Sequence, residues 1–294
     1  MQTLRLQARS IAASGLAAIA LCGCVGPPNR VDTAAEQRAA NDPAALTRIA
    51  DAAAQSGEIQ TADAFYKRAA TLDPANVDSQ IKYARMLTAQ GHAEEAIEQL
   101  TRARTASPEN PRLAATLGKL LVLVHRAGPA TSVFRGALNT HPNDLALMVG
   151  LGVALDADQN PAAAQDLYRR VLAVEPHSTA ARNDLALSLA LSGHPAEALE
   201  QFRTLRLEMS EAGASQSALA TVSGNLALTY GLEGDMRNAA QTAATALTPS
   251  DLANNMRFYS ALAPGAPAPA AGNELPPAPA VSPASPPATG APPA

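Results

Sequence analysis

Residues 77–110 read VDSQIKYARMLTAQGHAEEAIEQLTRARTASPEN, and residues 111–144 repeat the pattern as PRLAATLGKLLVLVHRAGPATSVFRGALNTHPND. Across residues 41–176 this 34-residue unit occurs four times. Each copy carries a proline at the same place, at Pro74, Pro108, Pro142 and Pro176. A fixed period of this length is the strongest indication of the fold in the sequence. One unit cannot bury its apolar face alone, so it must stack on its copies.

Aligning the units on their prolines places residues of similar size in columns. A column of alanines lies twelve residues before the proline, at Ala62, Ala96, Ala130 and Ala164. A column of large residues lies eight before it, at Tyr66, Leu100, Phe134 and Tyr168. A third column pairs a large residue with a small one, at Ile49-Ala50, Tyr83-Ala84, Leu117-Gly118 and Leu151-Gly152. We interpret each unit as two antiparallel helices. The small residues let the helix backbones approach, the large ones fill the gap between neighbouring units, and the proline ends the second helix.

This pattern resembles the tetratricopeptide repeat (TPR), over roughly three quarters of the chain. The resemblance implies an all-α fold, a right-handed TPR α-solenoid of about six helix hairpins and a C-terminal capping helix, within residues 41–262. Repeat five lacks the proline and has Ser210 there, so its second helix is expected to run on or fray. Matching repeat six requires seven inserted residues around 211–217, which we interpret as a longer loop. Residues 252–262 are expected to form the capping helix, after Ser250 or Asp251 as N-cap.

The first 23 residues resemble a bacterial lipoprotein signal peptide. They hold two arginines and then a short apolar run that ends in Leu21-Cys22-Gly23-Cys24. The resemblance implies cleavage before Cys24 and attachment of lipid, including palmitate, to its thiol. An ordinary secretory signal is the alternative. Val25 stands where inner-membrane retention would require an aspartate, so the outer membrane, facing the periplasm, is the expected location. Residues 24–40 are interpreted as a membrane-proximal linker.

The C-terminal residues 263–294 are rich in proline and alanine, and their single charged residue is Glu274. Such a composition is typical of a disordered, semi-stiff spacer with polyproline II character. A ligand for a proline-reading module is the alternative interpretation.

No catalytic or metal-binding set is visible in the sequence. The net charge of −4 argues against a general nucleic-acid binder. The five histidines fall in turns or beside the prolines, and none is spaced as a metal-ligand pair. Phosphate-binding loops and nucleophile elbows are also missing. The sequence therefore predicts a non-enzymatic protein without cofactor, metal or small-molecule substrate.

The TPR resemblance implies a groove lined by the first helix of each repeat. Its N-terminal half mixes cations with apolar residues, and its C-terminal half is aliphatic, which suits an amphipathic helix or apolar peptide. Two alternatives to partner binding remain open. The aliphatic residues could pack on neighbouring repeats, and the cations could be solvated surface charges. The predicted partner-binding residues are Ile81, Arg85, Arg112, Lys119, Val122, Val149, Val153, Asn183, Leu187, Leu191 and Leu228.

Two function classes fit these features. The lipobox, the segment 181–193 and the terminal Asn255-Met256-Arg257-Phe258-Tyr259 resemble the TadD-type lipoproteins that assemble tight-adherence (Flp) pili. That resemblance implies a pilotin-like scaffold whose partners are the secretin or other pilus and secretion components. The alternative is a periplasmic adaptor that tethers an envelope-remodelling or polysaccharide-export enzyme. A neighbouring secretin gene would favour the first, and a peptidase or glycan polymerase gene the second.

Overall fold

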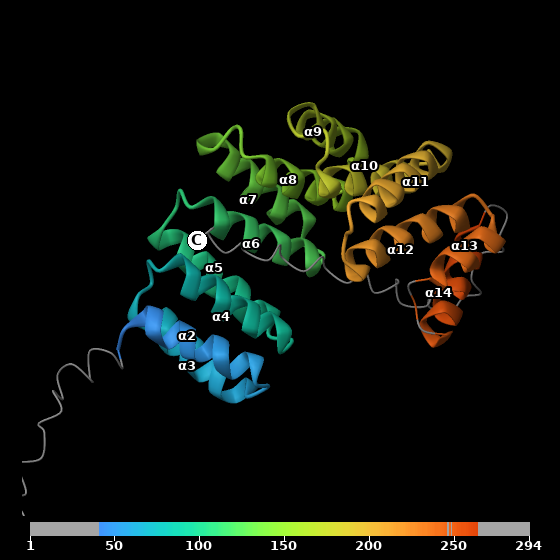
Figure 1. Cartoon of the computed structure of the whole chain (residues 1–294). Helices are drawn as coiled ribbons and strands as arrows, with labels where there is room; N and C mark the ends of the chain where they lie inside the picture. Colours follow the sequence, from blue (N-terminus) through green and yellow to red (C-terminus); the bar gives the residue numbers. More distant parts are fainter. Residues whose placement is uncertain (1–40, 246, 248, 264–294) are drawn as a thin grey trace, which may run out of the picture.

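The computed structural model describes residues 41–245, 247 and 249–263, which form helices and no strands (Figure 1). The helices form six consecutive hairpins. The first helices, called A helices below, are α2 (Pro43–Gln55), α4 (Val77–Ala89), α6 (Pro111–Leu123), α8 (Leu145–Ala157), α10 (Thr179–Leu191) and α12 (Gln216–Leu232). The second, or B, helices are α3 (Ile59–Leu72), α5 (Ala93–Ala106), α7 (Ala127–Thr140), α9 (Pro161–Val174), α11 (Pro195–Glu211) and α13 (Met236–Ala243). A last helix, α14 (Pro249–Leu262), follows. The predicted all-α TPR solenoid is confirmed.

The stack of hairpins curves toward its A helices. Each A helix contacts the B helix of its own hairpin and also the A helix of the next. Within the described residues, no two B helices are in comparable contact. Because neighbouring hairpins lie closer together on the A side, the A helices form the inner layer of the arc, which Figure 1 follows from α2 to α14.

The 34-residue period fixes where the A helices begin. The residue two places after each proline, or its equivalent at Asp42, is the N-cap. Its side-chain oxygen accepts hydrogen bonds from the backbone N–H groups that the first helical turn leaves free. These N-caps are Asp42, Asn76, Asn110 and Asp144. The turn inside each hairpin needs a left-handed residue: Gly91 supplies it in the second hairpin, and His125 and Gln159 adopt φ 59° in the third and fourth.

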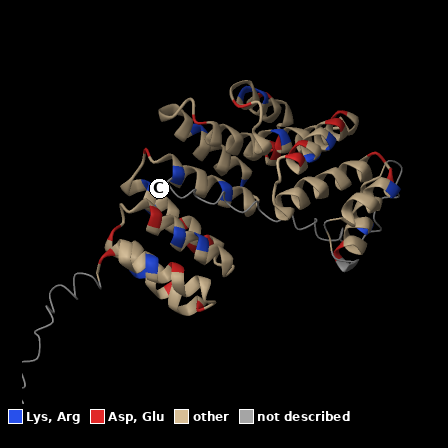
Figure 2. Ribbon diagram, viewed as in Figure 1, with Lys and Arg blue, Asp and Glu red and all other residues tan. Residues whose placement is uncertain are grey.

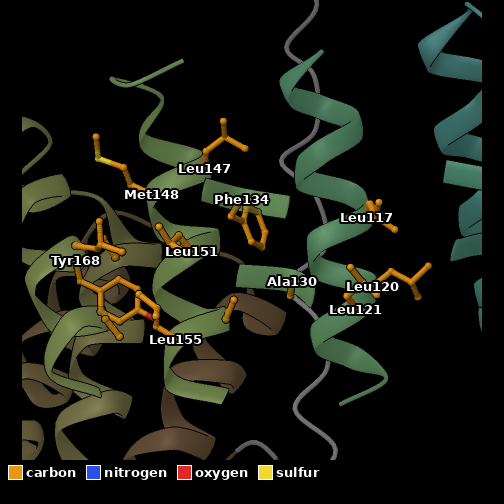
Figure 3. Close-up of a cluster of buried hydrophobic side chains, with 14 of the residues drawn as sticks. Leu117, Leu120, Leu121, Ala130, Phe134, Leu147, Met148, Leu151, Leu155 and Tyr168 are labelled. Carbon is orange, nitrogen blue, oxygen red and sulfur yellow. The ribbon is translucent and has the colours of Figure 1, made fainter. Parts of the chain in front are cut away.

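The core at the centre of the solenoid is built around Phe134, which is fully buried on α7 and lies between α6 and α8 (Figure 3). A Cβ added to Gly118 of α6 would lie 2.4 Å from the phenyl ring, and one added to Gly150 of α8 would lie equally close. The ring of Tyr168 occupies the same place beside Gly152. The small column was expected to admit the partner helix's backbone. At these glycines an aromatic ring fills the space instead.

The seven-residue insertion lengthens two helices instead of one loop. Helix α11 continues through Ser210 to Glu211, and α12 begins at Gln216, so only residues 212–215 form the turn. The expectation of a longer loop was wrong. Without a proline near residue 210, α11 continues until Gly213, whose φ of 70° ends the helix, and Ser215 caps α12 through its side chain.

Helix α14 covers the last hairpin. It begins at Pro249, three residues earlier than expected, and packs against α12 and α13. Tyr259 is 1% exposed, and a Cβ added to Gly231 of α12 would lie 2.7 Å from its Cβ. This is the capping role that the sequence predicts for the helix, because the end of a solenoid must shield its last apolar face.

Several predictions fall outside the described residues: the signal peptide, the lipidation site at Cys24, the linker and the tail after Ala263. Within the described residues, no helix combines the length and the hydropathy that a membrane crossing requires.

Candidate protein-binding face

One residue from each A helix marks the inner layer of the solenoid. These six positions are separated by 34 residues, or by 41 across the insertion, and we call their surface the A-helix face. From N- to C-terminus the row reads Asp51, Arg85, Lys119, Val153, Leu187 and Leu228. The row changes from charged to aliphatic midway. Figure 2 shows the same change by helix: α4 carries charges of both signs and α6 carries two cations, whereas α12 carries none.

The charged half contains an ion-pair ladder across three A helices. Lys82 Nζ lies 2.7 Å from a carboxylate oxygen of Asp51 on α2 and 3.3 Å from one of Asp78 on its own helix. Asp78 also lies 3.3 Å from a guanidinium nitrogen of Arg112 on α6. The hydroxyl of Tyr66 donates to the other oxygen of Asp51 at 2.7 Å. Arg112, a predicted partner-binding residue, is therefore already engaged within the chain.

The ladder alters the acidity of its members. Burial lowers the pKa of Lys82, but the Asp51 and Asp78 carboxylates outweigh it and leave the pKa raised. Burial and the hydrogen bond to Asp51 raise the pKa of Tyr66. Lys82 is therefore positively charged and Tyr66 neutral at neutral pH. The pairs are partly solvated, so each contributes at most about 1 kcal/mol, and their main effect is to hold the cations in place.

Arg85 and Lys119 remain as free cations on this face. Both side chains are exposed, and neither makes a hydrogen bond or ion pair among the residues described. They lie on neighbouring helices, α4 and α6, one period apart. An acidic partner group is what this pair can bind.

The aliphatic half is partly covered by the protein itself. Its residues are half-buried and packed against the core, and these are Val122, Val149, Val153, Leu187 and Leu228. Two predicted residues depart from this state. Ile81 is only 3% exposed and belongs to the core, so it is not available to a partner. Leu191, the last residue of α10, is 62% exposed.

A polar network lies among the aliphatic residues. Asp156 of α8 accepts hydrogen bonds from the hydroxyls of Ser188, at 2.6 Å, and Tyr168, at 2.9 Å. On α10, Asn183 donates to Asp184 at 3.1 Å and accepts from Asn225 of α12 at 2.9 Å. Asn183, a predicted partner-binding residue, therefore joins α10 to α12. Asn225 itself is buried and bonds within the chain.

Asp184 is the most perturbed carboxyl of this network. Burial raises its pKa to about 6, Asp156 adds to the rise, and Asn183 and the charge of Lys119 oppose it. Burial also raises the pKa of Asp156. Ionised at neutral pH, Asp184 places a poorly solvated negative charge beside an aliphatic surface.

Replacing Asp184 with asparagine should stabilise the protein at pH 7. The folded-state pKa exceeds the unfolded value near 3.9, so the native state binds more protons between about pH 4 and 6, and its stability falls as the pH rises through that window. We expect a gain of about 1–3 kcal/mol at pH 7 and a flatter stability profile between pH 4 and 6. Urea unfolding at a series of pH values measures both. The exposed Asp158 on α8's C-terminal side serves as control; an Asp184→Asn profile as steep as the parent's would contradict the assignment.

Comparisons with known proteins agree with this architecture. A tetratricopeptide repeat family model matches residues 53–120. A tetratricopeptide repeat protein from Parabacteroides merdae superposes with a TM-score of 0.59 at 19% identity, covering 74% of this chain and 84% of its own. PilW, described as a widely conserved type IV pilus biogenesis factor, superposes with a TM-score of 0.55 at 20% identity, covering 69% of this chain and 90% of its own. A thermophilic TPR protein of Thermus thermophilus superposes with a TM-score of 0.52 at 18% identity, covering 63% of this chain and 98% of its own. The search of curated proteins finds no match. At these identities the similar structures show the fold alone.

Proposed function

We propose that this chain is a non-enzymatic, lipid-anchored scaffold that binds a segment of another protein on its A-helix face. The observation that carries the proposal is the composition of that face. Exposed Arg85 and Lys119 lie at one end, and half-buried Val153, Leu187 and Leu228 follow along the inner layer. An amphipathic helix with an acidic end matches both parts, since its apolar side meets the aliphatic row and its acidic end meets the cations.

The biological setting that we propose is assembly of a tight-adherence (Flp) pilus at the outer membrane. In this role the protein would help the secretin reach, insert into or remain assembled in that membrane. The lipobox ending at Cys24 supports a membrane anchor, and the similarity to PilW adds support from a protein described as a pilus biogenesis factor. The TPR solenoid suits a binding role because its inner layer presents an extended surface for another chain.

The test is capture of the partner from detergent-solubilised membranes by the tagged full chain. A variant carrying Leu187→Asp and Leu191→Asp should recover at least ten times less partner, because two charges would lie under the partner's apolar side. The matched control is Leu72→Asp with Val174→Asp, since these residues are 45% and 67% exposed at the ends of the B helices α3 and α9. Far-UV circular dichroism must show unchanged helicity. Equal recovery by the inner and outer variants would refute the A-helix face as the binding surface.

A charge-reversal variant tests the other end of the face. Arg85→Glu with Lys119→Glu should also lower recovery, whereas Arg135→Glu, an exposed cation on α7, should not. Mass spectrometry identifies the captured protein and so tests the proposed role in pilus assembly. A secretin supports pilus assembly, and a peptidase or glycan polymerase in its place would contradict that part of the proposal.

A further inference from the structure

A cavity of about 450 Å³ lies outside the A-helix face, between α11, α12 and the segment after α13. It sits where the seven-residue insertion lengthens α11 and α12, and its volume falls in the range of ligand pockets in proteins. The residues that matter for its chemistry are Arg203, Arg206, Leu207, Leu219, Ser223 and Thr245. Two guanidinium groups therefore face aliphatic side chains and hydroxyls across one opening.

The two arginines of the cavity differ in their partners. Arg203 is paired: it lies 2.7 Å from Glu200, donates to the Tyr230 hydroxyl at 3.1 Å, and sits 5.5 Å from the centre of the Tyr230 ring. Arg206 is half-buried and makes no hydrogen bond or ion pair within the described part of the chain. The hydroxyl of Ser223, a residue only 5% exposed, likewise has no partner there.

Among the residues that the structure describes, no aspartate or glutamate lines the cavity. An unpaired guanidinium beside leucines, with a buried hydroxyl available to donate, is suited to a carboxylate that is followed by an aliphatic side chain. The C-terminal tail contains one such pair. Glu274 is the only charged residue after Ala263, and Leu275 follows it as the only leucine.

We propose that Glu274 and Leu275 of the chain's own tail bind in this cavity, with the carboxylate on Arg206 and the leucine on Leu207 and Leu219. The tail is long enough. Thr245 lines the cavity just before α14, and the tail begins at the other end of this helix, which spans about 21 Å. The eleven residues from Ala263 to Glu274 reach about 34 Å at the rise of a proline-rich chain.

Tethering makes even a weak contact effective. A segment joined by a short linker has an effective concentration on the order of millimolar. A contact with a dissociation constant of about 1 mM would then be roughly half occupied. The binding does not depend on the proposed pilus role, because the cavity involves neither the A-helix face nor the lipid anchor.

Disulfide trapping tests the proposal in the full chain. Cys22 and Cys24, the only two cysteines, are first replaced by serine. Ser210→Cys then places a thiol on the cavity wall, one helical turn from Arg206, and Asn273→Cys places one beside Glu274. We expect this pair to form an intramolecular disulfide at least ten times faster than the control pair, Ser210→Cys with Ser285→Cys. Electrophoresis without reductant and mass spectrometry measure the rates.

A charge swap separates specific binding from random collision of the tail. Glu274→Gln, which leaves every described helix untouched, should slow trapping to the control rate. Arg206→Glu should do the same, and adding Glu274→Arg to it should restore fast trapping. Equal rates for the Asn273 and Ser285 thiols would overturn the proposal, as would failure of the swap to restore the rate. Disulfides that link two chains would overturn the intramolecular assignment.

Discussion

Phe134→Ala is expected to lower the free energy of unfolding by about 3–5 kcal/mol, the usual cost of emptying a buried phenyl site. The ring is fully buried between α6 and α8, where two glycines have made room for it, so no neighbouring side chain can fill the space. A solenoid holds together through contacts between adjacent hairpins. The loss should therefore weaken the junction between the third and fourth hairpins more than either half.

Chemical denaturation gives the total change for Phe134→Ala, and amide hydrogen exchange locates it. Faster exchange should concentrate in α6, α7 and α8. The matched control is Phe202→Ala on α11, which is also fully buried but two hairpins away. If exchange rose equally everywhere in Phe134→Ala, the solenoid would be unfolding as a single unit and the junction would have no special role.

A double-mutant cycle shows whether Gly150 is small because of this ring. With Phe134 present, Gly150→Ala should cost about 1–3 kcal/mol, since the new Cβ would overlap the ring. With Phe134→Ala the same change should be neutral or stabilise by up to about 1 kcal/mol, because alanine is the better helix former. Additive effects in the two backgrounds would contradict the packing described.

Much of the fold follows from the sequence because its elements obey one period. The prolines predict the ends of the B helices, and the residue two places later caps the next A helix, as Asn76 and Asn110 show. The insertion near residue 211 was harder to place. Residues 210–217 include alanine, glutamate and glutamine, which serve in helices as well as in loops, and propensity alone does not choose between them.

The candidate face was less predictable because it depends on pairing across hairpins. The sequence predicted Arg112 as a partner-binding cation, yet Asp78, one period earlier, pairs with it. A search for opposite charges 31–34 residues apart would have found this pair and that of Lys82 with Asp51. The burial of Ile81 and the link from Asn183 to Asn225 depend on how closely neighbouring A helices approach, which the sequence pattern does not specify.

Cys24→Ala is expected to abolish stable membrane attachment and labelling of the protein with palmitate. Each buried methylene of an acyl chain contributes about 0.8 kcal/mol, so two or more chains give an anchor that a peripheral contact does not replace. The described helices offer no membrane-crossing segment of their own. Cys22→Ala, two residues earlier, is the matched control and should leave both labelling and sedimentation unchanged.

One complication of Cys24→Ala requires a second variant. If the signal peptide is not cleaved, its apolar run alone can hold the protein in the inner membrane. A chain whose first 24 residues are replaced by an ordinary cleavable secretory signal avoids this and should be recovered in the soluble periplasmic fraction. Washing with high salt removes any contribution from charged partner contacts, which are screened under those conditions. A mature, unlipidated protein that still sediments with the outer membrane after this wash would contradict the lipid anchor, because attachment would then reside in the solenoid or its partner.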